Sequence, residues 1–190
     1  MLQPITSFPR SGSHLTKQYF TSLSGISCRI NHSPIKIDGS ISCIRNPQES
    51  ISSILTMELL FCEFKFENPN LSKNKDTMDL FLETKIKMWV HDYKIFYEFL
   101  ASSGHLLIEY NDLIKNPEQK ILEILSIKNI KPLKEPEPLA NLKDDIEKGY
   151  VVKSKPFDIY NYVFEFTSGH IDNDSLAIFD ELCRASKKQI

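Results

Sequence analysis

Short apolar runs alternate along the chain with longer segments in which apolar residues recur at helical spacing. The apolar runs predict strands at residues 5–8, 26–30, 40–44 and 105–110. The helical spacing predicts helices at residues 13–23, 47–62, 116–125, 158–167 and 173–186, and a long helix that begins at Asp76. Strands that alternate with helices indicate an α/β fold with a parallel sheet, and such sheets bind ligands at the carboxyl ends of their strands.

Individual residues mark the starts of two of these helices. Asn46 can cap a helix, Pro47 suits the first helical position, and Glu49 stands where a capping-box acid reaches back. The long helix is expected to start at Asp76, after a polar stretch from residue 66 that reads as a loop. Its apolar face includes Phe81, Trp89, Tyr93, Phe96 and Leu100.

One local pattern permits a second interpretation. In "IKIDGSIS", residues 35–42, apolar positions alternate about Asp38 and Gly39, which is typical of a β-hairpin. The run from Ser40 into the capped helix at Pro47 equally fits a strand of a parallel sheet. The two interpretations give His32 different neighbours.

Composition favours one ordinary globular domain, residues 1–190. Of the 190 residues, 41% are apolar and 25% charged, and the net charge is −2. Such a balance lacks the basic excess of a nucleic-acid-binding protein, so no nucleic-acid partner is expected and any anion site must be local. The frequent Ile, Lys and Asn indicate an AT-rich genome, with a viral or a bacterial source as the expectation.

The cysteines and the apolar stretches indicate in which cell compartment the protein is expected. Cys28, Cys43, Cys62 and Cys183 form no CxxC pair and lie near no His at zinc spacing, so reduced thiols in the cytoplasm are expected. The longest apolar stretch, "ILTMELLFCEF", contains Glu58 and is well short of the roughly 20 residues that cross a bilayer. We therefore expect no membrane span, and the first apolar segment starts too early to leave room for an export signal.

The stretch "SFPRSGSHLTKQYF", residues 7–20, leads from the first predicted strand into the first predicted helix. A turn of small residues before a helix presents free N–H groups and the positive end of the helix dipole, which favour phosphate or sulfate. Arg10 adds a permanent charge, and Ser11 and Ser13 add hydroxyl donors. The alternative is a plain connection with Ser as the helix cap. The pattern GxxxxGK[ST] is absent, which disfavours an ordinary ATP-binding loop.

A second constellation lies in "CIRNPQESISSIL", residues 43–55. Arg45 follows the third predicted strand and Ser53 comes eight residues later, so the two side chains could bind a second phosphate. With Pro9-Arg10-Ser11-Gly12-Ser13-His14 and Arg45-Asn46-Pro47, the chain resembles the sulfotransferase family that uses 3′-phosphoadenosine 5′-phosphosulfate. A third likeness is "LLIEYNDLIKNPEQ", residues 106–119, which resembles the strand of that family ending in Arg-Tyr-Glu-Asp-Leu.

The chain departs from the family pattern at several positions. His14 replaces a Thr or Ser of the first motif, although an imidazole N–H can also donate to a phosphate. Glu109 and Asn111 replace the Arg and Glu of the third motif, so we interpret that segment as structural. The basic glycine loop of the family is echoed only by Lys148-Gly149, with Lys153 and Lys155 nearby; a solvated charge run is the alternative explanation.

The resemblance implies a three-layer α/β/α sandwich around a central parallel sheet and transfer of a sulfuryl group to an acceptor hydroxyl or amine. In this scheme Arg10, Ser11, Gly12, Ser13 and His14 hold the 5′-phosphosulfate, and Arg10 stabilises charge on the leaving oxygen. Arg45 and Ser53 hold the 3′-phosphate, with Lys148 and Gly149 closing over it. The product nucleotide is 3′-phosphoadenosine 5′-phosphate, and the scheme requires no metal.

Transfer also requires a base, for which the resemblance implies His32 in "RINHSP"; a surface-loop histidine is the alternative, and His91 is a weaker candidate. The acceptor is expected to be a small molecule or a carbohydrate. The aromatic residues Trp89, Tyr93, Phe96 and Tyr97 are expected in the core, with an acceptor pocket as the alternative. Two other functions stay open, a non-catalytic nucleotide-binding protein and a small-molecule kinase with an atypical phosphate loop.

Overall fold

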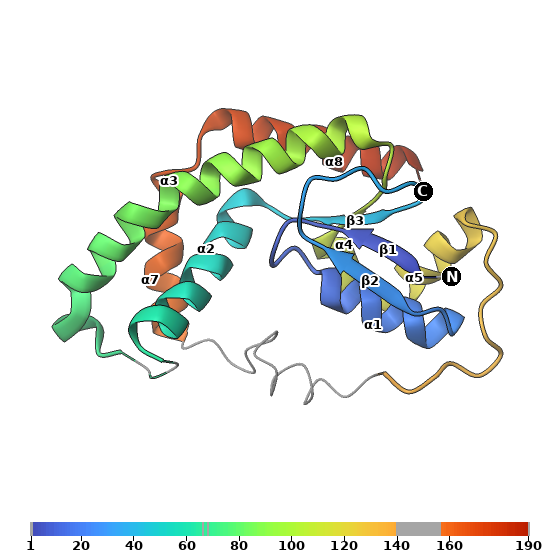
Figure 1. Cartoon of the computed structure of the whole chain (residues 1–190), viewed down its shortest axis with the longest axis horizontal. Coiled ribbons are helices and arrows are strands. Elements are labelled where there is room, and N and C mark those ends of the chain that lie inside the picture. The colour runs from blue at the N-terminus through green and yellow to red at the C-terminus, as the bar shows by residue number, and fades with distance from the viewer. Residues whose placement is uncertain (1, 66, 68, 140–156, 190) are drawn as a thin grey trace.

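The structure is a computed structural model that describes residues 2–65, 67, 69–139 and 157–189. Four strands form one sheet in the order β2-β1-β3-β4, and every neighbouring pair is parallel (Figure 1). They are β1 (Gln3–Thr6), β2 (Cys28–Asn31), β3 (Ile41–Ile44) and β4 (Leu106–Glu109). The expected parallel sheet is confirmed. The hairpin interpretation of residues 35–42 is wrong, because residues 35–37 form no strand and β3 pairs with β1 and β4.

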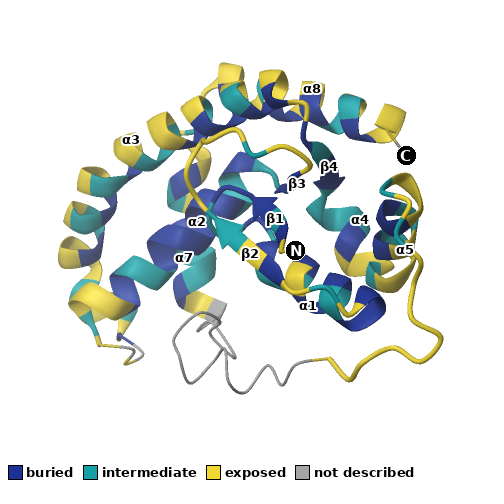
Figure 2. Cartoon of the chain, turned by 45° about the vertical axis from the view of Figure 1, so that its right-hand side comes forward, coloured by how far each residue is buried: buried dark blue, intermediate teal, exposed yellow. Residues whose placement is uncertain are grey.

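The helices are α1 (Ser13–Ser24), α2 (Pro47–Glu58), α3 (Leu71–Ser103), α4 (Tyr110–Lys115), α5 (Pro117–Ile127), α7 (Phe157–Ser168) and α8 (Asn173–Gln189). A π-helical turn, η1 (Leu59–Glu63), extends α2. Figure 2 shows α3 and α8 on one side of the sheet and α1 and α5 on the other, which is the expected three-layer arrangement. None of the helices in the described part of the chain has the length and apolar character needed to cross a membrane.

Alternating side chains of the strands divide the core into two parts. Ile41 and Cys43 of β3 point into a cluster with residues of α1, α4 and α5, such as Phe20, Leu113 and Ile121. Ile44 of β3 and Leu107 of β4 belong to the other cluster, which contains residues of α2, α3, α7 and α8. The period of two along a strand therefore supplies both faces of the sheet with apolar residues, as expected for a sheet covered on both sides.

Several predicted boundaries differ from the structure by a few residues. Helix α3 begins at Leu71 rather than Asp76, because the Asn70 side chain accepts a hydrogen bond from the Ser72 N–H and caps the helix one turn earlier. Regular α2 ends at Glu58, and the next residues form η1. A short helix, α4, follows β4 directly.

Gly12, between β1 and α1, is fixed by its backbone and by its neighbours. Its φ of +103° is one that L side chains rarely adopt. A Cβ at this position would lie 2.7 Å from Cδ2 of Tyr110 and 2.9 Å from Sγ of Cys43. The close approach of the turn to β3 and α4 therefore requires glycine.

We expect Gly12→Ala to destabilise the protein by about 2–4 kcal/mol, because left-handed strain and overpacking add. Gly104→Ala is the matched control: Gly104 has φ +71° but no atom within 4 Å of the added Cβ. We expect Gly104→Ala to lower the free energy of unfolding by about 1–2 kcal/mol, from backbone strain alone. Denaturant titration of both variants measures the two losses: the midpoint should fall while the dependence of the free energy of unfolding on denaturant concentration stays the same. Equal losses for the two variants would contradict the close contact at Gly12.

Candidate functional site

The carboxyl ends of the two central strands bring the predicted anion-binding residues together. Arg10 follows β1, Arg45 follows β3, and these strands are neighbours in the sheet. The Arg45 Nη1 atom donates to the Arg10 carbonyl oxygen at 3.1 Å, and the Arg10 Nε atom donates to the Ser53 Oγ atom at 3.3 Å. The two sequence motifs therefore form one contiguous site.

The Arg45 side chain is held on several sides. Its Nε atom donates to a Glu49 carboxylate oxygen at 2.9 Å, and its guanidinium lies over the Tyr110 ring, 4.3 Å from the ring centroid. Only 16% of this side chain is exposed. Ion pairing and cation–π contact both fix the plane of the guanidinium, which presents its remaining N–H donors in a constant direction. Glu49, expected to complete a capping box, thus pairs with Arg45.

Arg10 has an unusual backbone and an unfavourable electrostatic environment. Its φ is +63°, in the left-handed region that costs a non-glycine residue about 1–2 kcal/mol. Burial and, secondarily, the positive charge of Arg45 lower the pKa of the Arg10 guanidinium, while Tyr110 acts in the opposite direction. Two cations this close favour the arrival of an anion, which would relieve their repulsion.

The turn after Arg10 leaves the start of α1 available to such an anion. Gly12 is the N-cap residue, and no side chain caps the helix there. By contrast, the N-terminus of α2 is capped by Asn46, whose side chain accepts from the Gln48 N–H at 3.0 Å. Ser11 and Ser13 are buried, and the Ser11 hydroxyl lies 3.3 Å from the Ser50 hydroxyl of α2. The amino end of α1 and the two arginines thus face the same region.

His32 lies where the loop after β2 meets the loop after β1. Its Nδ1 atom is 2.7 Å from the Ser7 carbonyl oxygen, three residues before Arg10. Since a carbonyl only accepts, Nδ1 carries a proton, and in a neutral imidazole Nε2 then holds the lone pair. The ring is exposed, so Nε2 can reach a bound molecule.

The other histidines have different surroundings. His14 is half-buried in the first turn of α1, and His91 is exposed on α3. His105 is buried beside the amino end of β4, where its Nδ1 atom lies 3.0 Å from the Ser42 hydroxyl. It therefore lies at the end of the sheet opposite to Arg45. Lys148 and Gly149, with Lys153 and Lys155, fall outside the described residues.

Several residues contact the site although the sequence did not predict these contacts. Tyr110 belongs to the segment interpreted as structural, yet its ring contacts both Arg45 and the space beside Gly12. Tyr93 and Tyr97 are buried core residues, as expected, but their hydroxyls bond to the Arg45 backbone. The four-residue spacing of Arg45 and Glu49, across the start of the predicted helix, could have revealed their pairing. No local signal reveals the tyrosines, because their contacts depend on the tertiary fold.

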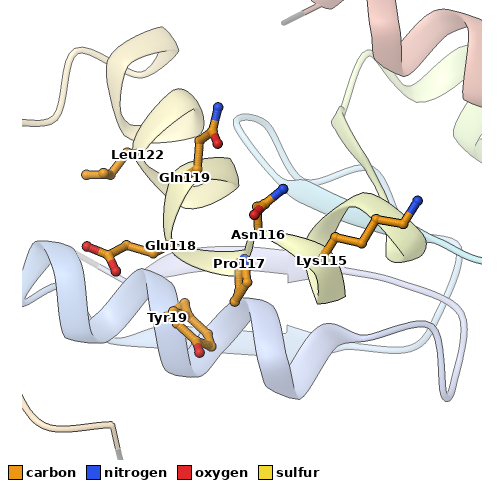
Figure 3. Close-up of a pocket in the computed structure, with 7 residues that line it drawn as sticks. All are labelled: Tyr19, Lys115, Asn116, Pro117, Glu118, Gln119 and Leu122. Atoms are coloured by element: carbon orange, nitrogen blue, oxygen red, sulfur yellow. The ribbon is translucent and has the colours of Figure 1, made fainter.

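A separate hollow of about 430 Å³ lies between α1 and the junction of α4 with α5 (Figure 3). It is lined by Tyr19, Lys115, Asn116, Pro117, Glu118, Gln119 and Leu122. None of the predicted site residues lines it. Within the described ranges, no three His, Cys, Asp or Glu side chains are grouped so that they could hold a metal ion.

The fold is that of an α/β protein in which two arginines and an uncapped helix start meet at the carboxyl edge of a parallel sheet, an arrangement that favours anions. A model of the sulfotransferase domain matches residues 21–148, and the chain belongs to this family. The match contains Arg45, Ser53 and Tyr110 and begins after the Arg10 turn. It supports sulfotransfer activity in general. No curated protein and no solved structure matches the chain at a significant level.

The electrostatics of the site predict binding of inorganic sulfate. Sulfate should raise the melting temperature more than chloride at equal ionic strength, because it relieves the repulsion between Arg10 and Arg45. Arg10→Ala or Arg45→Ala should weaken sulfate binding about tenfold or more, since a hydrogen bond to a charged group contributes about 1.5–3 kcal/mol. Arg29→Ala, at an exposed arginine of β2, is the control and should leave the shift unchanged. Identical shifts in all variants would show that sulfate acts as a general stabilising salt.

Proposed function

We propose that the protein transfers a sulfuryl group from 3′-phosphoadenosine 5′-phosphosulfate to a hydroxyl or amine of a small-molecule or carbohydrate acceptor. The observation that carries this proposal is the convergence of Arg10, Arg45 and Ser53 beside the uncapped start of α1, in a chain of the sulfotransferase domain family. The donor has anionic groups at its 5′ and 3′ ends. A contiguous site with two cations suits both ends of such a nucleotide.

In this proposal the turn between β1 and α1 binds the 5′-phosphosulfate. Backbone N–H groups of residues 12–14 and the dipole of α1 face the anion, with hydroxyls from Ser11 and Ser13 and the imidazole of His14 as further donors. The Arg10 guanidinium stabilises the negative charge that develops on the leaving oxygen, which is electrostatic catalysis by a preorganised group. The left-handed backbone of Arg10 supports this assignment, because strained residues cluster at functional sites.

Arg45 and Ser53 bind the 3′-phosphate and so select this nucleotide over ATP. The support is the fixed Arg45 guanidinium, held by Glu49 and Tyr110, which loses little freedom on binding. Lys148 and Gly149 are proposed to close over the same phosphate, as the resemblance to the family implies.

His32 acts as the general base in this scheme. Its Nε2 atom takes the proton of the acceptor hydroxyl while the acceptor oxygen forms a bond to sulfur and the bond from sulfur to the 5′-phosphate oxygen breaks. The products are the sulfated acceptor and 3′-phosphoadenosine 5′-phosphate. The bond to the Ser7 carbonyl supports this role, because it orients the ring and leaves the lone pair on Nε2.

Nucleotide selectivity tests the assignment of the two phosphate sites. At about 100 times its dissociation constant, 3′-phosphoadenosine 5′-phosphate should stabilise the protein by roughly 2.7 kcal/mol, which is about 5–10 °C in melting temperature. ATP and AMP should give much smaller shifts, because neither presents a phosphate to Arg45. In Arg45→Ala the three nucleotides should become similar. Equal shifts with ATP in the wild-type protein would favour a kinase.

Turnover separates an enzyme from a nucleotide-binding protein. With labelled donor and a panel of acceptors, we expect His32→Ala to lower kcat by roughly 10²–10⁴-fold, the usual contribution of a general base. The thermal shift with 3′-phosphoadenosine 5′-phosphate should persist in this variant, and His91→Ala should keep full activity. Full activity of His32→Ala would exclude it as the base. Absence of transfer by the wild-type protein to every acceptor would favour the non-catalytic nucleotide-binding function.

A further inference from the structure

Two tyrosines of α3 hold the backbone of Arg45 from within the core. The Tyr97 hydroxyl accepts a hydrogen bond from the Arg45 N–H at 2.7 Å and lies 3.0 Å from the Arg45 carbonyl oxygen. The Tyr93 hydroxyl donates to the same carbonyl at 2.8 Å. Both side chains are fully buried, and their rings are stacked with centroids 3.9 Å apart.

The same tyrosine pair also contacts the chain segment that leads into the Arg10 turn. Burial raises the pKa of the Tyr97 hydroxyl, and Ser11, in the turn that follows Arg10, acts in the opposite direction to lower it. Phe8, two residues before Arg10, packs edge-on against Tyr93 and Tyr97, with centroids 5.1 and 6.3 Å apart. The tyrosine pair thus contacts both segments that the proposed function assigns to the two ends of the nucleotide: it bonds to the Arg45 backbone, and it packs on Phe8 at the start of the Arg10 turn.

The backbone at Arg45 needs these partners. The register of β3 with β4 ends at Ile44 opposite Glu109, so the polar backbone groups of Arg45 lie beyond the ladder. A buried N–H without a partner costs about 1–3 kcal/mol, and Tyr97 supplies the acceptor. The position of Arg45 relative to the Arg10 turn therefore depends on a hydroxyl that comes from a distant helix.

We propose that Tyr97, assisted by Tyr93, is a positioning residue that sets the spacing between the Arg10 turn and Arg45, and thereby the preference for a nucleotide with phosphates at both ends. This inference rests on the proposed function. Tyr97 has the larger role, because its hydroxyl bonds to both the N–H and the carbonyl oxygen of Arg45, whereas the Tyr93 hydroxyl bonds only to the carbonyl oxygen.

The test compares two nucleotides in hydroxyl-deletion variants that keep the aromatic ring. Isothermal titration gives the ratio of the dissociation constants of AMP and 3′-phosphoadenosine 5′-phosphate. In Tyr97→Phe this ratio should fall about tenfold, which corresponds to about 1.4 kcal/mol. In Tyr93→Phe the same ratio should fall only about two- to threefold, a change that the loss of one hydrogen bond can produce. Tyr162→Phe is the matched control, because its hydroxyl bonds to Asp79 of α3 rather than to either segment, and its ratio should not change.

The outcomes separate this inference from the proposed function. A wild-type protein that binds both nucleotides equally would overturn the proposed function and this inference with it. A wild-type preference that persists unchanged in Tyr97→Phe would overturn the inference alone, even if the melting temperature falls, because a purely structural hydroxyl changes stability and not the ratio. A loss of preference in Tyr162→Phe as large as in Tyr97→Phe would also overturn it.

Discussion

The positive charges of Arg10 and Arg45 meet at one edge of the sheet, and the contacts around them hold the two residues there. Coulomb repulsion and the loss of hydration oppose the pair, and the lowered pKa of Arg10 expresses this cost. The structure offsets it locally: the Glu49 carboxylate and the Tyr110 ring contact Arg45, and the Arg10 carbonyl accepts from Arg45. The sheet order is what makes the pair possible, because it places β1 beside β3.

The groups that are proposed to bind the nucleotide lie on buried elements. Ser11 and Ser53 are almost completely inaccessible, and Phe8, just before the Arg10 turn, packs on Tyr93 and Tyr97 of α3. Groups held in this way need little rearrangement when a ligand arrives, which suits a site that acts by preorganised charge. His32 differs, since it stands on an exposed loop and is fixed by one hydrogen bond to Ser7. The phosphate sites and the proposed base therefore differ in rigidity.

The sequence predicted those parts of the molecule that depend on local pattern. Periodicity located all four strands, and the strand ends placed Arg10 and Arg45 at one edge of the sheet, where the structure joins them. The hairpin expectation was wrong although Gly39 does turn the chain at φ +71°, because β3 pairs with β1 and β4 instead of with the preceding residues. Tyr97 and Tyr110 reach the site only through tertiary packing, so no spacing in the sequence reveals them.

The left-handed backbone of Arg10 has an evolutionary consequence. Glycine adopts this conformation freely, and Asn or Asp tolerate it, so each would relieve backbone strain at position 10. All three would also remove the charge that the site presents there. Stability and the proposed anion binding are therefore opposed at a single position, and a chain selected for stability alone would lose this arginine.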